Sequence, residues 1–264
     1  MIYLLPRDYL IIYKENIALI IILLITISII LAAAYQAPIA QDKSYHQFFD
    51  SNTIFNIPNF WNVLSNLPFL FVGIWGTLWI IKSDTTSYLH EIKLAYFALF
   101  IGVGLVSIGS GYYHLSPNNN TLMWDRLPMT IAFMALFSII LSEFIHIQLG
   151  RILLLPLLIV GISSVMYWHF SELAGQGDLR FYALVQFLPI LIIPIILIFF
   201  QSVFDRRNAY WLLLAAYLLA KILEYYDEET HRIVFFLSGH SLKHIVAAAG
   251  VYLLLRSYKT RLRC

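Results

Sequence analysis

Charged side chains are scarce in this chain of 264 residues: Asp, Glu, Lys and Arg make up 12% of it, whereas hydrophobic residues make up 60%. Soluble domains are about one quarter charged, so this chain has too few charges to cover a water-facing surface. The composition excludes a soluble globule, and it also excludes intrinsic disorder, collagen and coiled coil. The net charge of +2 offers no basic face, which argues against nucleic acid as a partner.

Cysteine is nearly absent. The single one, Cys264, ends the sequence, and this excludes an intrachain disulfide and a cysteine-rich metal site. What the chain has instead is long apolar runs, eight of which approach the roughly 20 residues that a helix needs to cross a bilayer. These runs are continuous rather than alternating, so they predict an all-α polytopic membrane protein. They cover about residues 16–35, 61–81, 92–113, 122–144, 149–168, 181–201, 210–226 and 235–256.

The first run has two interpretations. Positive residues, a long apolar stretch and Ala32, Ala33 and Ala34 together resemble a cleaved signal peptide. The stretch is longer than a usual signal core, which favours a retained helix. We therefore expect an extra N-terminal transmembrane helix with an outer linker at 1–44, a seven-helix core at 45–258 and a basic cytoplasmic tail at 259–264.

The distribution of Lys and Arg predicts the orientation. Eleven lie at the N-terminus, in the even-numbered connections and in the tail, whereas four lie in or beside the odd-numbered connections. Cytoplasmic loops are enriched in Lys and Arg, so both termini are expected in the cytoplasm. The eleven are Arg7, Lys14, Lys82, Lys93, Arg151, Arg206, Arg207, Arg256, Lys259, Arg261 and Arg263, and the four are Lys43, Arg126, Arg180 and Arg232.

Ionisable residues within membrane spans are costly and mark candidate functional sites. In the predicted topology, three histidines and one aspartate from three different spans converge in the outer half of the membrane. Ser110 and His114 lie four residues apart at the outer end of the third span, so they share a helical face. Asp125 lies in the first turns of the fourth span, and His240 and His244 share a face of the eighth.

Three imidazoles with one open position are a common zinc arrangement in enzymes. Zinc lowers the pKa of a bound water to about 7, and a nearby carboxylate can carry the water's proton to a leaving group. A single histidine in a span is more often a hydrogen-bond partner between helices, but three at one depth with a carboxylate favour a metal. The other five histidines are expected near the membrane surfaces: His46, His90, His146, His169 and His231. His46 is also within reach of the site.

Other charged residues in or near the spans favour structural pairing. Lys221 and Glu224 lie one turn apart in the seventh span, which predicts an internal ion pair. Lys243 lies beside a proposed ligand, and an acidic partner in the seventh span is the preferred interpretation over a substrate contact. Asp178 and Arg180 are expected to organise the outer mouth.

Three stretches resemble the alkaline ceramidases, which belong to a superfamily of seven-helix membrane hydrolases that includes the adiponectin and progestin receptors. They are NFWNVLSN at 59–66, Ser110 and His114 followed by WDRLPM at 124–129, and the HxxxH of His240 and His244. The resemblance covers about residues 45–258, and the chain looks like a member of a bacterial branch of the family.

The resemblance implies zinc held by His114, His240 and His244, with Asp125 as general acid/base and Ser110 as stabiliser of the site. It implies hydrolysis of the amide of ceramide to sphingosine and a fatty acid. The family's seven core helices begin outside the cytoplasm and end inside it. This agrees with the Lys and Arg count if the first helix of this chain is additional to those seven.

The chain also departs from the family pattern. Asn59 stands where eukaryotic members have a calcium-binding glutamate, and the preceding segment offers only Asp42, Asp50 and Asn52 as oxygen ligands. A tight calcium site needs several carboxylates, so the sequence disfavours calcium. The family's aromatic pair between the last two histidines is Leu242 and Lys243 here, which predicts an altered acyl or headgroup preference.

Together these observations predict a zinc-dependent amidohydrolase of the bacterial inner membrane, which cleaves ceramide or a related N-acyl lipid in the outer, periplasmic half. The alternatives are a hydrolase of a different lipid amide or ester, and a receptor or sensor with a structural zinc. A transporter would need an inverted repeat or broken helices, and the sequence has no visible internal repeat. The oligomeric state and the acyl-chain length stay open.

Overall fold

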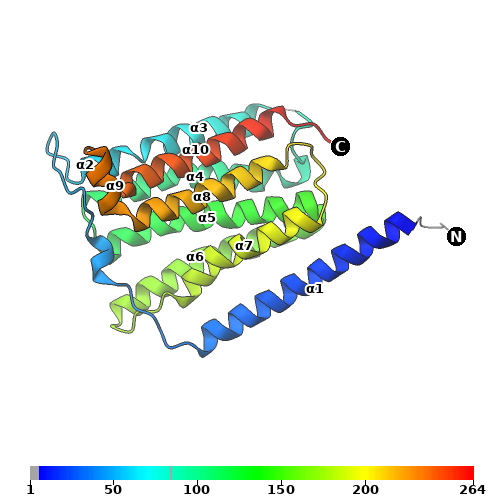
Figure 1. Ribbon diagram of the computed structural model, residues 1–264, viewed down its shortest axis with the longest axis horizontal. Coiled ribbons are helices and arrows are strands. Elements are labelled where there is room, and N and C mark those ends of the chain that lie inside the picture. Colours follow the sequence, from blue (N-terminus) through cyan, green and yellow to red (C-terminus); the bar gives the residue numbers. More distant parts are fainter. Residues whose placement is uncertain (1–5, 84) are drawn as a thin grey trace.

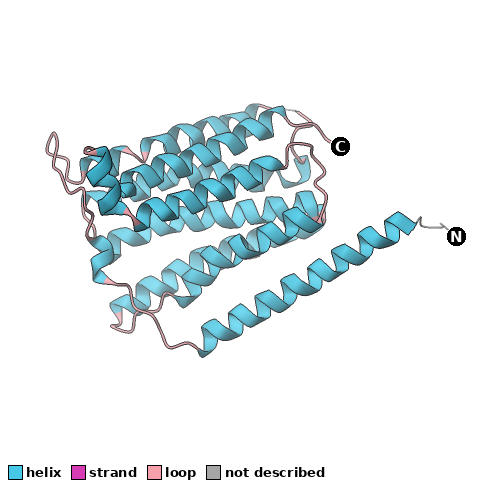
Figure 2. Ribbon diagram, viewed as in Figure 1, coloured by secondary structure: helices cyan, strands magenta, loops and turns pink. Residues whose placement is uncertain are grey.

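The computed structural model describes residues 6–83 and 85–264, and helices form most of this part of the chain (Figure 1, Figure 2). Two isolated bridges are the only β pairing among the described residues, so the all-α prediction is confirmed. Residues 1–5 of the predicted 1–44 segment lie outside the described residues. The helices are α1 (Pro6–Tyr35), α2 (Phe60–Leu64), α3 (Leu67–Lys82), α4 (Lys93–Leu115), α5 (Asn119–Phe144), α6 (Ile147–Leu173), α7 (Arg180–Phe199), α8 (Asn208–Tyr225), α9 (Asp227–Val234) and α10 (Gly239–Thr260), with 3-10 turns η1 (Lys43–His46) and η2 (His90–Ile92).

Among the described residues, six helical segments are long and apolar enough to cross a membrane, and they coincide with the first six predicted runs. They include α1, α2 with α3, and α4 to α7. The helix α8 falls short of this test, and it carries Lys221 and Glu224. The protein is an integral membrane protein.

The predicted start of the eighth span at Phe235 is wrong. The short helix α9 ends at Val234, and the chain then turns by 93° into α10, which begins at Gly239. Phe235 has φ 66°, in the left-handed region that interrupts a helix. Ser238 caps α10 by accepting a hydrogen bond from the backbone of Ser241, so the new helix starts with a partnered donor. The pair α9 and α10 together meets the span test.

Seven helices, α3 to α8 and α10, pack into one bundle (Figure 1). The most extensive contacts join α4 to α3 and α5, α5 to α6, and α8 to α10, and α10 also touches α3. The helix α1 packs against α7 and otherwise stands apart, with only 6% of its apolar window buried. This arrangement confirms a seven-helix core with an additional N-terminal helix.

Two glycines set close helix approaches near one end of the bundle. A Cβ on Gly109 of α4 would lie 2.0 Å from the carbonyl oxygen of Trp124 in α5. A Cβ on Gly239 of α10 would lie 2.1 Å from the carbonyl oxygen of Leu223 in α8. Only glycine permits these approaches, which bring Ser110 close to the start of α5 and the first turns of α10 close to the end of α8.

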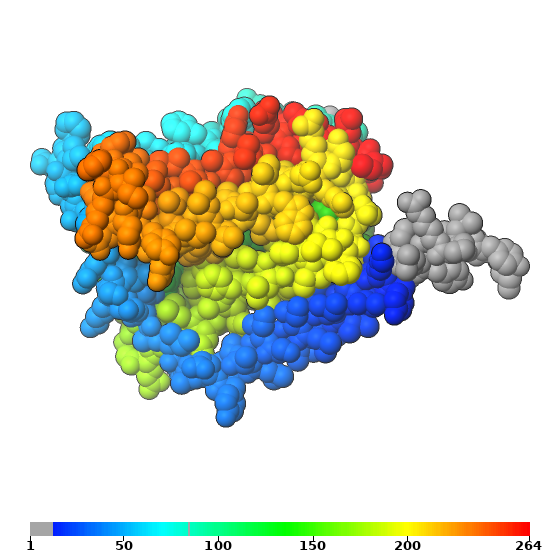
Figure 3. All heavy atoms as spheres, viewed as in Figure 1, coloured from blue at the N-terminus to red at the C-terminus, as the bar shows by residue number. Residues whose placement is uncertain are grey.

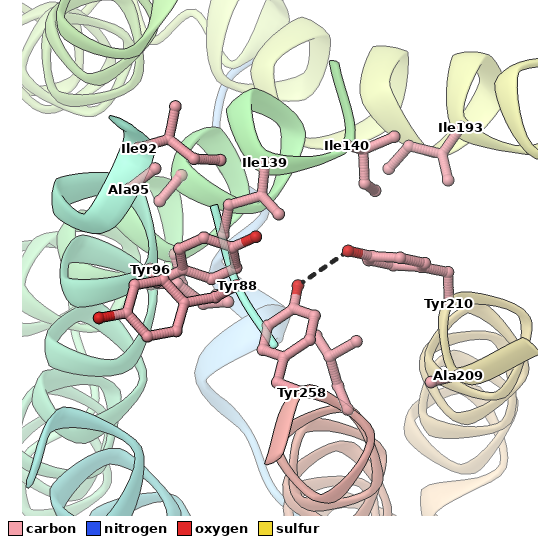
Figure 4. Close-up of a cluster of buried hydrophobic side chains, with 14 of the residues drawn as sticks. Tyr88, Ile92, Ala95, Tyr96, Ile139, Ile140, Ile193, Ala209, Tyr210 and Tyr258 are labelled. Carbon is pink, nitrogen blue, oxygen red and sulfur yellow. Dashed lines mark hydrogen bonds between the residues drawn. The ribbon is translucent and has the colours of Figure 1, made fainter. Parts of the chain in front are cut away.

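A buried polar cluster joins four helices at the opposite end. Arg261, just after α10, forms a two-point ion pair with Glu143 of α5, at 2.6 and 2.9 Å. Tyr96 and Tyr210 donate to the same carboxylate, and Tyr210 lies 3.1 Å from Tyr258, as the dashed line in Figure 4 marks. Arg261 belongs to the predicted basic tail at 259–264, yet it is only 3% exposed. Part of this segment is therefore built into the bundle.

Candidate metal centre

Three histidine side chains meet between the end of α4 and the start of α10. The helices α2 and α9 lie at this end of the bundle (Figure 1). His114 lies in the last turn of α4, and His240 and His244 lie one turn apart at the start of α10. One potential ligand atom from each lies within 4.8 Å of the other two. Their exposed fractions are 1%, 6% and 7%. Among the described residues, this is the one group of three potential ligands close enough to hold a metal ion.

The hydrogen bonding of the three imidazoles fits a metal. Nδ1 of His114 and Nε2 of His240 are buried without a hydrogen-bond partner. Buried polar atoms are nearly always paired, and a neutral imidazole nitrogen with a free lone pair is a metal ligand. Three nitrogen ligands and an open position match zinc in enzymes. The residues present are therefore compatible with zinc.

Side chains in and beside α2 support the histidines. Oγ of Ser65 lies 2.8 Å from Nδ1 of His244 and 3.2 Å from the carbonyl oxygen of Asn62. If the hydroxyl donates to that carbonyl, it accepts from Nδ1–H, and this tautomer leaves Nε2 of His244 free for a metal. Nδ2 of Asn59 donates to the carbonyl oxygen of His114 at 2.8 Å.

The sequence alone indicated no individual role for Ser65 or Asn62. The signal was present, because both are polar and lie within the apolar run at 61–81. The sequence pattern could not identify the partner of Ser65, since His244 lies 179 residues away along the chain.

Ser110 and Asp125 lie next to this centre on neighbouring helices. Asn118 caps α5 in a reciprocal arrangement with Thr121, which fixes the start of the helix and hence the place of Asp125 two turns in. Ser110 and Asp125 both line the same cavity as His244. The structure thus brings both residues to the site, while their chemical roles stay predictions.

The cavity that begins at this centre has a volume of about 430 Å³. Along α10 its wall runs from His244 to Leu254, and ten residues of helix span about 15 Å. Its lining is mainly apolar and comes from α3, α4, α5, α7, α8 and α10, including Phe69, Leu99, Val103, Met129, Ile193 and Val251. Figure 3 shows the outer surface where α7 and α8 adjoin, with the green of deeper residues visible between them. The cavity fits a long apolar chain.

A cluster of charges also faces the cavity. Nζ of Lys221 and Nζ of Lys243 each lie 2.6 Å from one oxygen of Glu224. The predicted pairing within the seventh span is confirmed, and so is the acidic partner of Lys243. One carboxylate is therefore shared by two ammonium groups.

Asp178 and Arg180, which were expected to organise the outer mouth, form an ion pair at 2.8 Å. The Arg180 guanidinium, with its hydrogen bonds, lowers the pKa of Asp178 to about 2. Arg180 also donates to the carbonyl oxygens of Ala33 and Gln36. The pair thereby joins the end of α1 to the start of α7.

The remaining candidates have structural contacts. His46 bonds through its two ring nitrogens to the Tyr113 hydroxyl and to Asn119, both at 2.9 Å, so it packs beside the site without joining the triad. Asp42 caps η1, and Asp50 accepts from Asn52. The backbone amide of Ser44 lowers the pKa of Asp42. Outside the triad lie His90, His146, His169 and His231.

The geometry defines a multi-span membrane protein with a buried histidine centre at the head of an apolar cavity. A family model described as Ceramidase matches residues 50–261. The chain belongs to the Ceramidase family, and the membership implies a hydrolase that acts on the amide bond of a lipid. No curated protein matches the chain.

Proposed function

We propose that the chain is a zinc-dependent membrane amidohydrolase that cleaves ceramide or a related N-acyl lipid to a fatty acid and a free amine. With ceramide, the amine is a sphingoid base. The observation that carries the proposal is a centre of three buried histidines, with unpaired ring nitrogens, at the head of an apolar cavity. The amide group of a lipid can reach the histidines while the lipid's apolar tails stay in the apolar cavity.

In this proposal His114, His240 and His244 hold the zinc. Bound there, zinc supplies Lewis acidity, which polarises an amide carbonyl and lowers the pKa of water to about 7. Ser65 holds the ring of His244 in the orientation and tautomer that present Nε2.

Asp125 carries the proton in this proposal. An amide nitrogen leaves as an amine only when it receives a proton, and a carboxylate in the cavity can take that proton from the attacking water. Ser110 lines the same cavity, and in this proposal its hydroxyl orients the carboxyl group. The apolar walls exclude bulk water, which strengthens these interactions.

The orientation is also part of the proposal. The Lys and Arg asymmetry supports cytoplasmic termini and an active site in the outer half of a bacterial inner membrane. Cysteines introduced at Asn119 and Asn208 should react with impermeant reagents from opposite sides. Reaction of both from one side would refute the orientation and leave the chemistry untouched.

The substrate test is incubation of the purified protein with ceramide and with a mixed lipid extract, followed by mass spectrometry of released fatty acids and amines. We expect paired release of a fatty acid and an amine, absent with Asp125→Asn. A zinc-loaded wild-type protein that releases neither would favour a receptor with a structural metal. Release of a fatty acid with an alcohol would point to an ester.

A further inference from the structure

The proposed reaction does not use Arg126, a buried arginine at the head of the cavity. Arg126 follows Asp125 in α5, lines the cavity and is only 6% exposed. Its guanidinium carbon lies 4.1 Å from the ring centre of Trp168 and 4.6 Å from that of Tyr182. Among the described residues, no carboxylate forms a salt bridge with it.

Most of the hydrogen-bonding capacity of Arg126 is unused. A guanidinium has five N–H donors, and in the described part of the chain its one hydrogen bond runs from Nη2 to Oε1 of Gln41, at 2.6 Å. Nη1 is buried without a partner. The aromatic rings stabilise the cation, but they accept no hydrogen bond from its N–H donors. A buried charge with free donors is costly unless a ligand completes it.

The surrounding charges do not compensate for Arg126. Among the residues that line the cavity, three are basic and two are acidic: Arg126, Lys221 and Lys243 against Asp125 and Glu224. Glu224 already pairs with both lysines. The head of the cavity therefore has a surplus of positive charge, and a neutral headgroup would leave it uncompensated.

We infer that this chain prefers N-acyl lipids that carry an anionic group, such as a carboxylate or a sulfonate, close to the amide nitrogen, and that Arg126 binds this group. The planar fork of a guanidinium suits two-point binding of such oxyanions. Arg126 and Asp125 line the same cavity, so we expect the anion to lie within a few bonds of the reacting amide. This inference rests on the proposed function and narrows its substrate class.

Three lipids of one acyl length test the inference: N-palmitoylethanolamine is neutral, N-palmitoylglycine adds a carboxylate and N-palmitoyltaurine adds a sulfonate. Binding is measured on the chelator-treated full-length protein, so that neither zinc nor turnover contributes. We expect at least one anionic lipid to bind about 10-fold to 100-fold more tightly than the neutral one, as charge-assisted hydrogen bonds allow. A preference for one anion identifies the source of the negative charge.

The variant Arg126→Gln should abolish this preference, because the anionic lipids lose the cation that binds their charged group. The matched control is Arg232→Gln, because Arg232 pairs with Glu228 on exposed α9, outside the cavity. It should keep the preference. Equal binding of all three lipids by the wild-type protein overturns the inference, and that comparison needs no variant to fold. A preference that survives Arg126→Gln overturns it as well.

A second arm measures kcat/KM for the same lipids with the zinc-loaded protein, which separates this inference from the proposed function. Anion-selective binding without hydrolysis of any lipid would support the anion site and contradict the hydrolase. Hydrolysis of all three with equal kcat/KM, and without selective binding, would support the hydrolase and contradict the anion site.

Discussion

Two buried polar clusters lie at opposite ends of the bundle, and they differ in whether their hydrogen bonds are complete. At one end, Arg261 and Glu143 satisfy one another, and two tyrosines and the carbonyl of Ser87 form further hydrogen bonds. At the other end, His114 and His240 each keep a buried ring nitrogen without a partner. A complete network acts as a structural joint, whereas an incomplete one at a cavity indicates a ligand.

Removing one metal ligand from the incomplete cluster should have the largest effect on the protein's chemistry. His240→Ala should lose zinc and nearly all turnover, because two imidazoles hold the ion far less tightly than three. Zinc content by elemental analysis and product release on the same sample provide the check. His146→Asn is the control, since His146 caps α6 away from the centre and asparagine also caps helices. A His240→Ala protein with normal zinc content would contradict the assignment.

Asp125→Asn keeps the shape of the side chain but cannot accept a proton. We expect it to retain zinc and to lose turnover by about 10²–10⁴-fold, the range for a general acid/base. Zinc content and kcat are measured on one preparation. An inactive and zinc-free variant would instead make Asp125 a support for a metal ligand, and near-normal turnover would remove it from the mechanism.

The complete cluster should respond in stability and not in chemistry. Glu143→Gln leaves Arg261 as an unpaired buried cation, which costs about 3–5 kcal/mol in the free energy of unfolding. Thermal or denaturant unfolding in detergent checks this, with zinc content and kcat per folded molecule expected to stay near wild type. The control Glu228→Gln breaks an exposed pair with Arg232, worth about 0–1 kcal/mol. A large fall in kcat for folded Glu143→Gln would erase the distinction between the clusters.

Ser65→Ala should have the smallest effect of these substitutions, because it alters the metal site without removing a ligand. It removes the hydroxyl that orients His244, so zinc affinity should fall by about 10–100-fold while saturating zinc restores turnover. Titration with a competing chelator measures the affinity. Ser257→Ala, at the opposite end of α10 from the histidines, should leave the zinc affinity unchanged. An unaltered affinity in Ser65→Ala would show that this contact does not tune the metal site.

The sequence predicts the helices well and their partners less well. Long apolar runs locate α1 and α3 to α7, because burial in lipid depends on composition alone. The turn at Phe235 escaped prediction, since an apolar residue at positive φ has no signal in hydropathy. Arg261 counted only as a positive charge near the cytoplasm, and its pairing with Glu143 depends on tertiary packing across 118 residues.

The site shows the same division. The i, i+4 spacing of His240 and His244, and the span topology that brings in His114, could be predicted because helical geometry determines them. Ser65 and Arg126 could not, because their significance lies in which atoms surround them. The signs of the first were its polarity within an apolar run and its place in the stretch at 59–66 that resembles the family, and no sequence pattern reveals an unpaired Nη1.

The most direct test of the central claim is the dependence of lipid amide hydrolysis on zinc at the histidine centre. Purified protein is stripped with a chelator, and product release from ceramide and from the N-acyl lipids above is measured before and after zinc is returned. The account predicts no turnover in the stripped protein and full recovery with about one equivalent of zinc per chain. Undiminished turnover in protein shown by elemental analysis to hold no metal would contradict it.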